Sequence, residues 1–189
     1  MKQSVNMLVL SMIMGVIFIA DILLFVALGI GHPIPWLLLA VLIAVPYINN
    51  KLESKTFVTW KDEYSVGIHA IDDDHKKLLS LINNLQAAVH YHTGDEFEKK
   101  ALDELVDYTR FHFKREEELM EKHQFPEYES HRLEHEAMIE KVGGFIDEYQ
   151  QKGHEALEGV ADYLKEWLIN HINGTDQKYS AYLKERGEG

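Results

Sequence analysis

The sequence predicts an all-α protein, an up-down-up-down four-helix bundle that is preceded by one or two transmembrane helices. The first 50 of the 189 residues carry only two charged side chains, Lys2 and Asp21. After about residue 70, apolar residues recur with the 3.6-residue period of amphipathic helices in four successive segments. The short connections between these segments are typical of neighbouring antiparallel helices. The sequence therefore divides into a membrane anchor (1–50), a linker (51–60) and a helical domain (61–185).

The first predicted membrane helix covers residues 5–30. Its apolar run exceeds the roughly 20 residues that span a hydrocarbon core. It also exceeds the roughly 7 to 15 residues of a signal-peptide core, and no small-x-small cleavage site follows it. We therefore expect a retained anchor. A second, shorter apolar helix covers residues 34–48, with Pro46 near its end, and it is either a second span or an interfacial or re-entrant segment.

The orientation of the anchor depends on this second helix. If it crosses the membrane, the positive-inside rule places the helical domain in the cytoplasm, on the evidence of Lys2, Lys51, Lys55 and Lys61. If it does not cross, the domain lies on the opposite face. Asp21 falls inside the first span, where an ionisable group indicates function or helix pairing. Because the spans hold no second charge for a relay, a contact in a homo-oligomer is the favoured interpretation.

The composition excludes several classes of function. Lys and Arg number 19 against 31 Asp and Glu, for a net charge of −12, and such a surface would repel nucleic acid. The absence of cysteine excludes disulfides, thiolate nucleophiles, iron–sulfur clusters and Cys-ligated zinc. Eleven histidines among many acidic residues instead point to metals that imidazole and carboxylate hold.

Each of the four helices has its own start and stop signals. Thr93-Gly94 ends the first helix, Phe125-Pro126 the second and Lys152-Gly153 the third. The expected ranges are about 73–91, 95–122, 128–151 and 154–183.

Histidines continue the apolar stripes of the second and third helices. His112 and Glu116 are four residues apart on the second helix, and His131 and His135 have the same spacing on the third. This spacing brings two side chains together on one face, where both can reach one metal ion.

The first and fourth helices add further candidates. His75 lies at the start of the first helix, and His171 continues the stripe of the fourth. Asp176 follows His171 at five residues, a spacing that does not share a face in a regular helix. Either a local irregularity near Gly174 turns Asp176 inward, or its carboxylate reaches across from a neighbouring position.

The convergence of these candidates predicts a dinuclear metal site. An isolated histidine on an apolar stripe is more often a core residue with a satisfied hydrogen bond. Here all four helices direct such residues inward, and together they supply five imidazoles and two carboxylates, too many for one ion and suitable for two. Leaving seven such groups unpaired in a core would cost several kcal/mol. The other six histidines fall at helix ends or in loops, and we assign them no ligand role.

Four blocks of sequence resemble the hemerythrins, particularly bacterial hemerythrin domains. The resemblance extends from Trp60 to about Tyr182, and the four blocks are, in order, YSVGIHAIDDDH, YTRFHFKREEELM, FPEYESHRLEHEAM and WLINHINGTDQKY. The resemblance implies two iron ions bridged by an oxo or hydroxo group. It also implies the ligands: His131, His135 and His171 on one iron, His75 and His112 on the other, and Glu116 and Asp176 as bridges. Asp74 is a departure, because many relatives carry Gln or Glu there, but it lies beside a ligand and is not one itself.

The resemblance and the ligand types together indicate reversible binding of dioxygen. The iron with only two histidines would keep an open position for the gas. Neutral imidazoles stabilise high-valent iron less than the carboxylate-rich sites of ferritin-like oxidases do, which favours binding over substrate oxidation. Such a pocket must exclude water, and the residues that resemble the family's apolar lining are Phe113, Trp167, Leu168 and Ile172.

The expected function is therefore oxygen delivery or storage at the inner membrane of a bacterium, beside a membrane-bound oxygen-consuming enzyme. We expect dioxygen and membrane lipid as partners, with no nucleic acid. The alternatives are a sensor of oxygen, nitric oxide or redox state, a di-iron enzyme that consumes peroxide or nitric oxide, and a metal-free or zinc-containing scaffold. We expect no catalytic residues.

Overall fold

The computed structural model describes the backbone of residues 2–189 and the side chains of residues 11–48 and 57–189. The chain forms two compact units, Met1–Phe57 and Val58–Gly189. The side chains of Lys2, Lys51 and Lys55, which enter the expected orientation, lie outside the described residues. All regular structure in the described part is helical, so the prediction of an all-α protein is confirmed.

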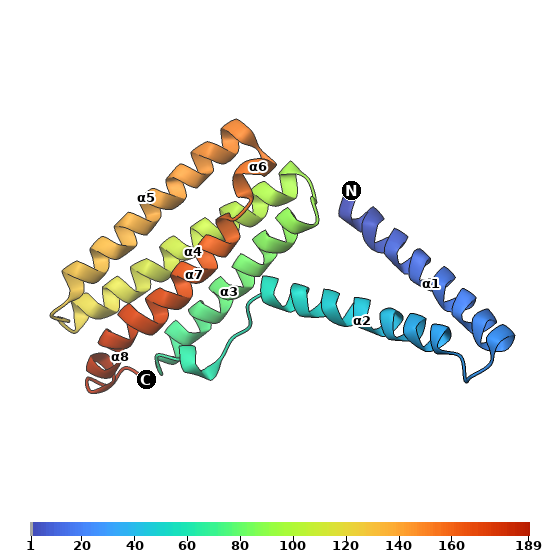
Figure 1. Ribbon diagram of the computed structural model, residues 1–189. Helices are drawn as coiled ribbons and strands as arrows, with labels where there is room; N and C mark the ends of the chain where they lie inside the picture. The colour runs from blue at the N-terminus through green and yellow to red at the C-terminus, as the bar shows by residue number, and fades with distance from the viewer. Residues whose placement is uncertain (1) are drawn as a thin grey trace. The chain divides into compact units, whose positions relative to one another are not determined.

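The first unit is a pair of helices, α1 (Lys2–Leu28) and α2 (Pro33–Thr56), joined by a short turn (Figure 1). Gly29 adopts φ +77°, a left-handed conformation that glycine accepts without steric cost and that commonly ends helices. Near the turn, the rings of Phe25 and Trp36 pack edge to face with centroids 5.3 Å apart. The helix α2 continues through the polar residues after Ile48, eight residues beyond its expected end.

Within α1, residues Ser11–Leu28 are long and apolar enough to cross a membrane, with a mean hydropathy of 2.6. The apolar part of α2, Pro33–Ile48, is shorter than this. Asp21 is only 2% exposed, and its Oδ1 has no hydrogen-bond partner among the described residues. Length and composition of this kind are shared by membrane helices and signal sequences.

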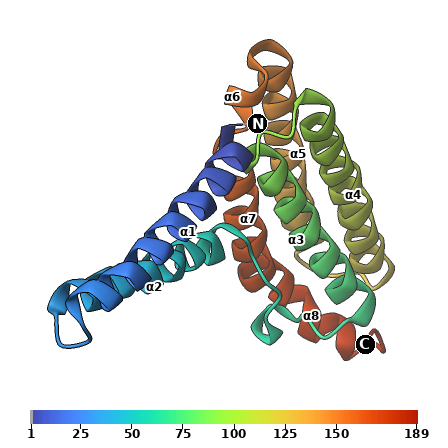
Figure 2. The ribbon, with the colours of Figure 1, turned by 90° about the vertical axis from the view of Figure 1, so that its right-hand side faces the viewer.

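The second unit is the four-helix bundle that the sequence predicts (Figures 1 and 2). Its first three arms are α3 (His69–His90), α4 (Asp95–Lys122) and α5 (Tyr128–Lys152), and the short 3₁₀ helix η1 (Asp62–Tyr64) precedes them. The fourth arm consists of α6 (His154–Leu157), α7 (Val160–His171), the π-helix η2 (Ile172–Asp176) and α8 (Gln177–Lys184).

The prediction of one continuous fourth helix was wrong. Glu158 and Gly159 interrupt it, and Gly159 adopts φ +80°, outside the helical range of other residues. The π-helix η2 interrupts the regular geometry a second time. The first arm also begins at His69, four residues before its expected start.

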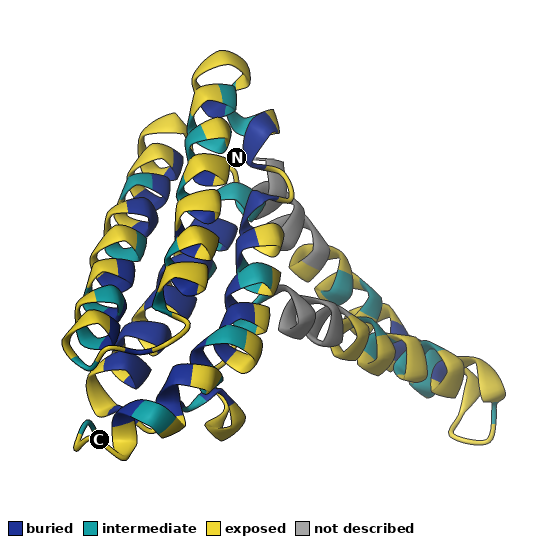
Figure 3. Ribbon diagram, turned by 90° about the vertical axis from the view of Figure 1, so that its left-hand side faces the viewer, coloured by how far each residue is buried: buried dark blue, intermediate teal, exposed yellow. Residues whose placement is uncertain are grey.

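The core lies where the apolar stripes of the four arms face one another, and Figure 3 shows these faces in dark blue. Burying one Leu, Ile or Val side chain contributes about 1.5–3 kcal/mol. Representative fully buried side chains are Leu78, Ile82, Leu85, Leu102, Leu105, Leu157 and Leu183.

Hydrogen bonds tie the segment before α3 to α8. The carboxylate of Asp72 accepts a hydrogen bond from the backbone N–H of Val66 (2.8 Å) and another from the Ser65 hydroxyl (2.5 Å). The Ser180 hydroxyl of α8 donates to the carbonyl oxygen of Val66 (2.5 Å). This arrangement holds the start of α3 beside the last arm, where the predicted ligands of both arms lie.

Candidate metal centre

The seven predicted ligand side chains meet inside the bundle. They come from all four arms, and each residue is at most 4% exposed. They are His75 on α3, His112 and Glu116 on α4, His131 and His135 on α5, His171 at the end of α7 and Asp176 at the end of η2.

Four of them form a first group, Glu116, His131, His135 and His171, whose ligand atoms all lie within 4.8 Å of one another. The Nε2 atom of His135 lies 3.0 Å from Nε2 of His131 and 3.1 Å from Nε2 of His171. It also lies 3.3 Å from Oε2 of Glu116. His135 is thus at the middle of this group.

A second group consists of His75, His112 and again Glu116. The carboxylate of Glu116 places Oε1 3.7 Å from Nε2 of His75 and Oε2 3.4 Å from Nε2 of His112. Glu116 belongs to both groups, so its carboxylate lies between them.

Asp176 also faces both groups. Its Oδ2 lies 3.3 Å from Nε2 of His75, and its Oδ1 lies 3.2 Å from Nε2 of His171 and 3.6 Å from Nε2 of His131. A π-helix closes hydrogen bonds between residues five apart, which matches the spacing from His171 to Asp176. Of the two alternatives that the sequence left open, the structure therefore has the local irregularity, and π-turns of this kind occur frequently at functional sites.

Two observations show that this cluster suits metal ions: the distances between its donor atoms, and the number of buried polar atoms that have no hydrogen-bond partner. Two ligands about 2.1 Å from a common ion, at angles of 90 to 110°, lie about 3.0–3.4 Å apart. Most of the nitrogen–oxygen and nitrogen–nitrogen distances given above fall in or close to this range. Buried polar atoms normally have partners, yet the following have no hydrogen-bond partner among the described residues: both ring nitrogens of His75 and His112, Nδ1 of His131, Oε2 of Glu116 and both carboxylate oxygens of Asp176. A donor set of imidazole and carboxylate suits iron and other borderline metals.

The charges of the cluster favour a cation. Burial alone would raise the pKa of Glu116, but the charge of His112 and the other imidazoles that face its carboxylate hold this pKa well below its usual value. Burial opposes protonation of His75, but the nearby carboxylates of Asp176 and Glu116 outweigh it and raise the pKa of His75 to about 9. Burial also opposes protonation of His135, but the carboxylates of Glu116 and Glu117 outweigh it and raise the pKa of His135 to about 9. The carboxylate of Glu116 is therefore ionised, and a metal ion would replace the protons of these imidazoles.

Tyr179 of α8 holds the shared carboxylate. Its hydroxyl donates a hydrogen bond to Oε1 of Glu116, and its side chain is fully buried. Burial and the neighbouring carboxylates raise the pKa of Tyr179 well above its usual value, so the hydroxyl keeps its proton and remains a donor. This contact leaves Oε2 of Glu116 to face His112 and His135.

Aromatic rings fix two of the imidazoles. The ring of Phe113 stacks on His135 with centroids 3.7 Å apart and an interplanar angle of 3°. The ring of Trp167 stacks on His171 at 4.4 Å and 14°. Both contacts cover the face of a ligand ring with apolar atoms, which excludes water from that side.

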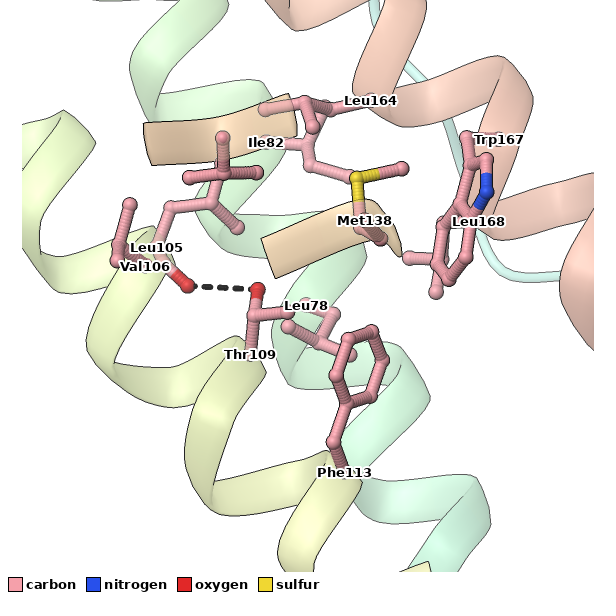
Figure 4. A pocket seen from close by; sticks show the side chains of 11 residues that line it. Leu78, Ile82, Leu105, Val106, Thr109, Phe113, Met138, Leu164, Trp167 and Leu168 are labelled. Atoms are coloured by element: carbon pink, nitrogen blue, oxygen red, sulfur yellow. Dashed lines mark hydrogen bonds between the residues drawn. The ribbon is translucent and has the colours of Figure 1, made fainter. Parts of the chain in front are cut away.

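An apolar cavity of about 30 Å³ reaches from these rings into the bundle (Figure 4). Phe113, Trp167 and Leu168 are among its lining residues, and the first two stack on His135 and His171, whereas Ile172 is fully buried but does not line the cavity. Its one hydroxyl, on Thr109, donates to the carbonyl oxygen of Leu105 (2.8 Å). Cavities with apolar walls remain dry. The other lining residues are Leu78, Ile82, Leu105, Val106, Met138, Val142 and Leu164.

Sequence reasoning missed two further carboxylates at the site. Glu117 and Glu134 lie within 3.3 Å of ligand imidazoles, although neither continues an apolar stripe. The signal that could have found them is their place in the chain, because Glu117 follows Glu116 and Glu134 precedes His135.

Comparison with known proteins gives one consistent result. The family model described as "Hemerythrin HHE cation binding domain" matches residues 66–183. A bacteriohemerythrin of Stenotrophomonas maltophilia (strain R551-3) is 33% identical over 132 residues, which cover 67% of this chain and 82% of that protein. A hemerythrin-like protein of Naegleria gruberi is 34% identical over 128 residues, which cover 66% and 92%.

The fold gives the same result. The crystal structure of wild-type hemerythrin matches with a TM-score of 0.59 and 27% identity, and the match covers 67% of this chain and 97% of that one. The resemblance that the four sequence blocks indicated is confirmed. The chain therefore belongs to the hemerythrin family, and its domain implies a non-haem iron centre.

Proposed function

We propose that this chain is a membrane-anchored, non-haem di-iron protein that binds dioxygen reversibly, for delivery to or storage near a membrane oxygen consumer. The observation that carries the proposal is that six of the seven buried side chains form two groups that share Glu116, and that the seventh, Asp176, faces both groups. One carboxylate between two sets of imidazoles is the arrangement that a pair of ions requires. We infer that the protein is an oxygen-binding protein and not an enzyme.

The two groups suggest which residues hold which ion. His131, His135 and His171 would hold one iron, and His75 and His112 the other. Glu116 and Asp176 would bridge the two. Iron supplies the reversible exchange of electrons with dioxygen. The second group offers one imidazole fewer than the first, so it has space for a diatomic ligand.

The residues around the proposed ligands hold these ligands in place and exclude water. The stacked rings of Phe113 and Trp167 restrict the orientation of His135 and His171. Tyr179 keeps its proton and orients the Glu116 carboxylate. The apolar cavity that Leu168 lines offers dioxygen a dry volume, and the one side-chain hydroxyl on its wall, on Thr109, is already hydrogen-bonded to the backbone.

Reversible oxygen binding is tested by titrating the full-length protein, loaded with ferrous iron in detergent under argon, with dioxygen. We expect a saturable optical change at one dioxygen per two irons that reverses when argon is restored. Zinc-loaded protein is the control and should show no change, because zinc has no redox chemistry. Irreversible oxidation, or continued consumption of oxygen, would count against a carrier and in favour of an enzyme.

Membrane attachment is supported by the apolar length of α1 and is tested by extraction. The chain should sediment with membranes, resist high salt and alkaline carbonate, and dissolve only in detergent. Release by carbonate would contradict the anchor. A mature chain that lacks its first helix would show instead that this helix is a cleaved signal.

A further inference from the structure

Carboxylates outside the seven proposed ligands face the outer nitrogens of three imidazoles. Glu117 Oε1 lies 2.9 Å from Nδ1 of His135, a hydrogen-bond distance. Glu134 Oε2 lies 3.3 Å from Nδ1 of His171. In each case Nδ1 is the nitrogen that points away from the centre, because Nε2 is the atom that faces the other ligands.

The third carboxylate is Asp74, whose Oδ2 lies 3.6 Å from Nδ1 of His112. It is buried, and it is fixed by hydrogen bonds from the Tyr108 hydroxyl (2.7 Å) and the Arg115 guanidinium (2.8 Å). Arg115 compensates its charge. No ion pair of this kind is found for Glu117 in the described part of the chain, and Glu134 instead accepts a hydrogen bond from the Thr175 hydroxyl of η2 (2.9 Å).

The three carboxylates follow one rule in the fold. Each is the chain neighbour of a proposed ligand: Asp74 precedes His75, Glu117 follows Glu116, and Glu134 precedes His135. Each faces an imidazole on the next arm of the bundle, from α3 to α4, from α4 to α5 and from α5 to α7. Each of these three arms therefore supplies a proposed iron ligand and also a carboxylate that faces a ligand imidazole on the next arm. The outer nitrogens of His75 and His131 face no such carboxylate among the described residues, and the 3.6 Å approach of Asp74 to Nδ1 of His112 is longer than a hydrogen bond.

We propose that these three ligand-facing carboxylates (Asp74, Glu117 and Glu134) are positioning residues for the iron centre, which keep the outer N–H of an imidazole oriented and increase the electron donation of that ring to iron. The inference rests on the proposed iron ligands. A carboxylate acceptor on the outer nitrogen of a metal-bound imidazole fixes the tautomer and the orientation of the ring and raises its basicity. A more basic ring stabilises ferric iron relative to ferrous iron.

The contacts also rank the three residues. Glu117 should have the largest effect, because its contact with the imidazole is the shortest and no Lys or Arg of the described structure pairs with its charge. Glu134 should follow at 3.3 Å. Asp74 should have the smallest effect, because its contact is the longest and Arg115 compensates its charge.

Two exposed glutamates on the same helices provide matched control positions for Glu117 and Glu134. Glu118 and Glu136 are exposed neighbours of Glu117 and His135 on the same helices, and they pair with Lys114 and Arg132 on the surface instead of with an imidazole. The changes Glu118→Gln and Glu136→Gln remove the same charge from the same helices without removing a contact to an imidazole. Any difference between Glu117→Gln and Glu118→Gln therefore reports the contact with His135.

The experiment uses the full-length protein in detergent, loaded with ferrous iron under argon. It measures iron retention against a chelator, the midpoint reduction potential and the ultraviolet charge-transfer spectrum. In Glu117→Gln we expect iron affinity to fall roughly 10- to 100-fold, the potential to rise and the spectrum to shift. Glu134→Gln should show smaller changes of the same sign, and the two control variants should match the parent protein. Thr175→Val keeps every carboxylate but loses the contact that holds Glu134, so it should resemble a weak form of Glu134→Gln.

The outcomes separate this inference from the proposed function. If the parent protein binds no iron, the proposed function fails and the inference fails with it. If the parent holds two irons but Glu117→Gln matches Glu118→Gln in potential and retention, the ligands stand and the inference is overturned. If Glu117→Gln does not fold, Glu134→Gln against Glu136→Gln decides in the same way.

Discussion

The His135→Ala variant is expected to lose its iron together with the ultraviolet charge-transfer bands of the iron centre. His135 Nε2 lies within 3.3 Å of Glu116 and of the two other imidazoles of the first group. Its removal takes away the donor at the middle of that group and one member of the stacked pair with Phe113. Loss of a ligand should weaken iron binding by more than the roughly 10- to 100-fold that loss of an outer partner costs.

Elemental analysis of iron per chain and an ultraviolet spectrum check this result. His69→Ala is the matched control, because the His69 side chain is 85% exposed and pairs with Asp73 on the surface. The control should retain two irons per chain. A His135→Ala protein with two irons and an unchanged spectrum would remove His135 from the ligand set.

The Leu168→Ala variant should keep its iron but convert to the ferric form faster in air. Leu168 is buried and forms part of the cavity wall beside Phe113 and Trp167. A Leu to Ala change at a buried site costs about 2–5 kcal/mol of stability and leaves a larger cavity. Because Phe113 and Trp167, which line this cavity, stack on His135 and His171, water that enters the enlarged cavity comes close to the proposed ligands.

The rate of ferric conversion is followed optically after ferrous protein is exposed to air. Leu157→Ala is a suitable control, because Leu157 is equally buried in α6 but does not line the cavity. It should lower the melting temperature by a similar amount without faster oxidation. Equal oxidation rates in Leu168→Ala and the parent protein would refute the role of the dry cavity.

Much of the bundle was predictable because its periodicity is regular. The four-residue spacing of His112 and Glu116 fixes a common face in any α-helix, and the structure places both in the cluster. The same reasoning could not locate the break at Gly159, because a positive φ leaves the apolar period on either side intact. It also placed the start of α3 too late, because the first turn of that helix buries Ile71 among polar residues and shows no clear stripe.

Contacts between different helices also could not be predicted from the sequence, because they depend on how the helices pack. The spacing of His171 and Asp176 left two arrangements open, since only the packed structure decides whether a helix brings two side chains that are five positions apart to the same face. Glu117 and Glu134 look like ordinary solvent-facing acids on a helical wheel. Their role depends on the distance between neighbouring arms, which no single helix encodes.

The π-helix η2 limits where residues can be inserted into or deleted from this protein. Each residue advances a helix by about 100°, so the extra residue of η2 sets the rotation of all of α8. Tyr179 and Leu183, both fully buried, face inward only in that rotation. Deletion of a single codon within residues 172–176 would turn both away from the interior and separate Tyr179 from Glu116. A codon gained near Gly159, where the chain already leaves the helix, would be absorbed as a longer loop, so insertions and deletions among descendants of this gene should gather there and avoid η2.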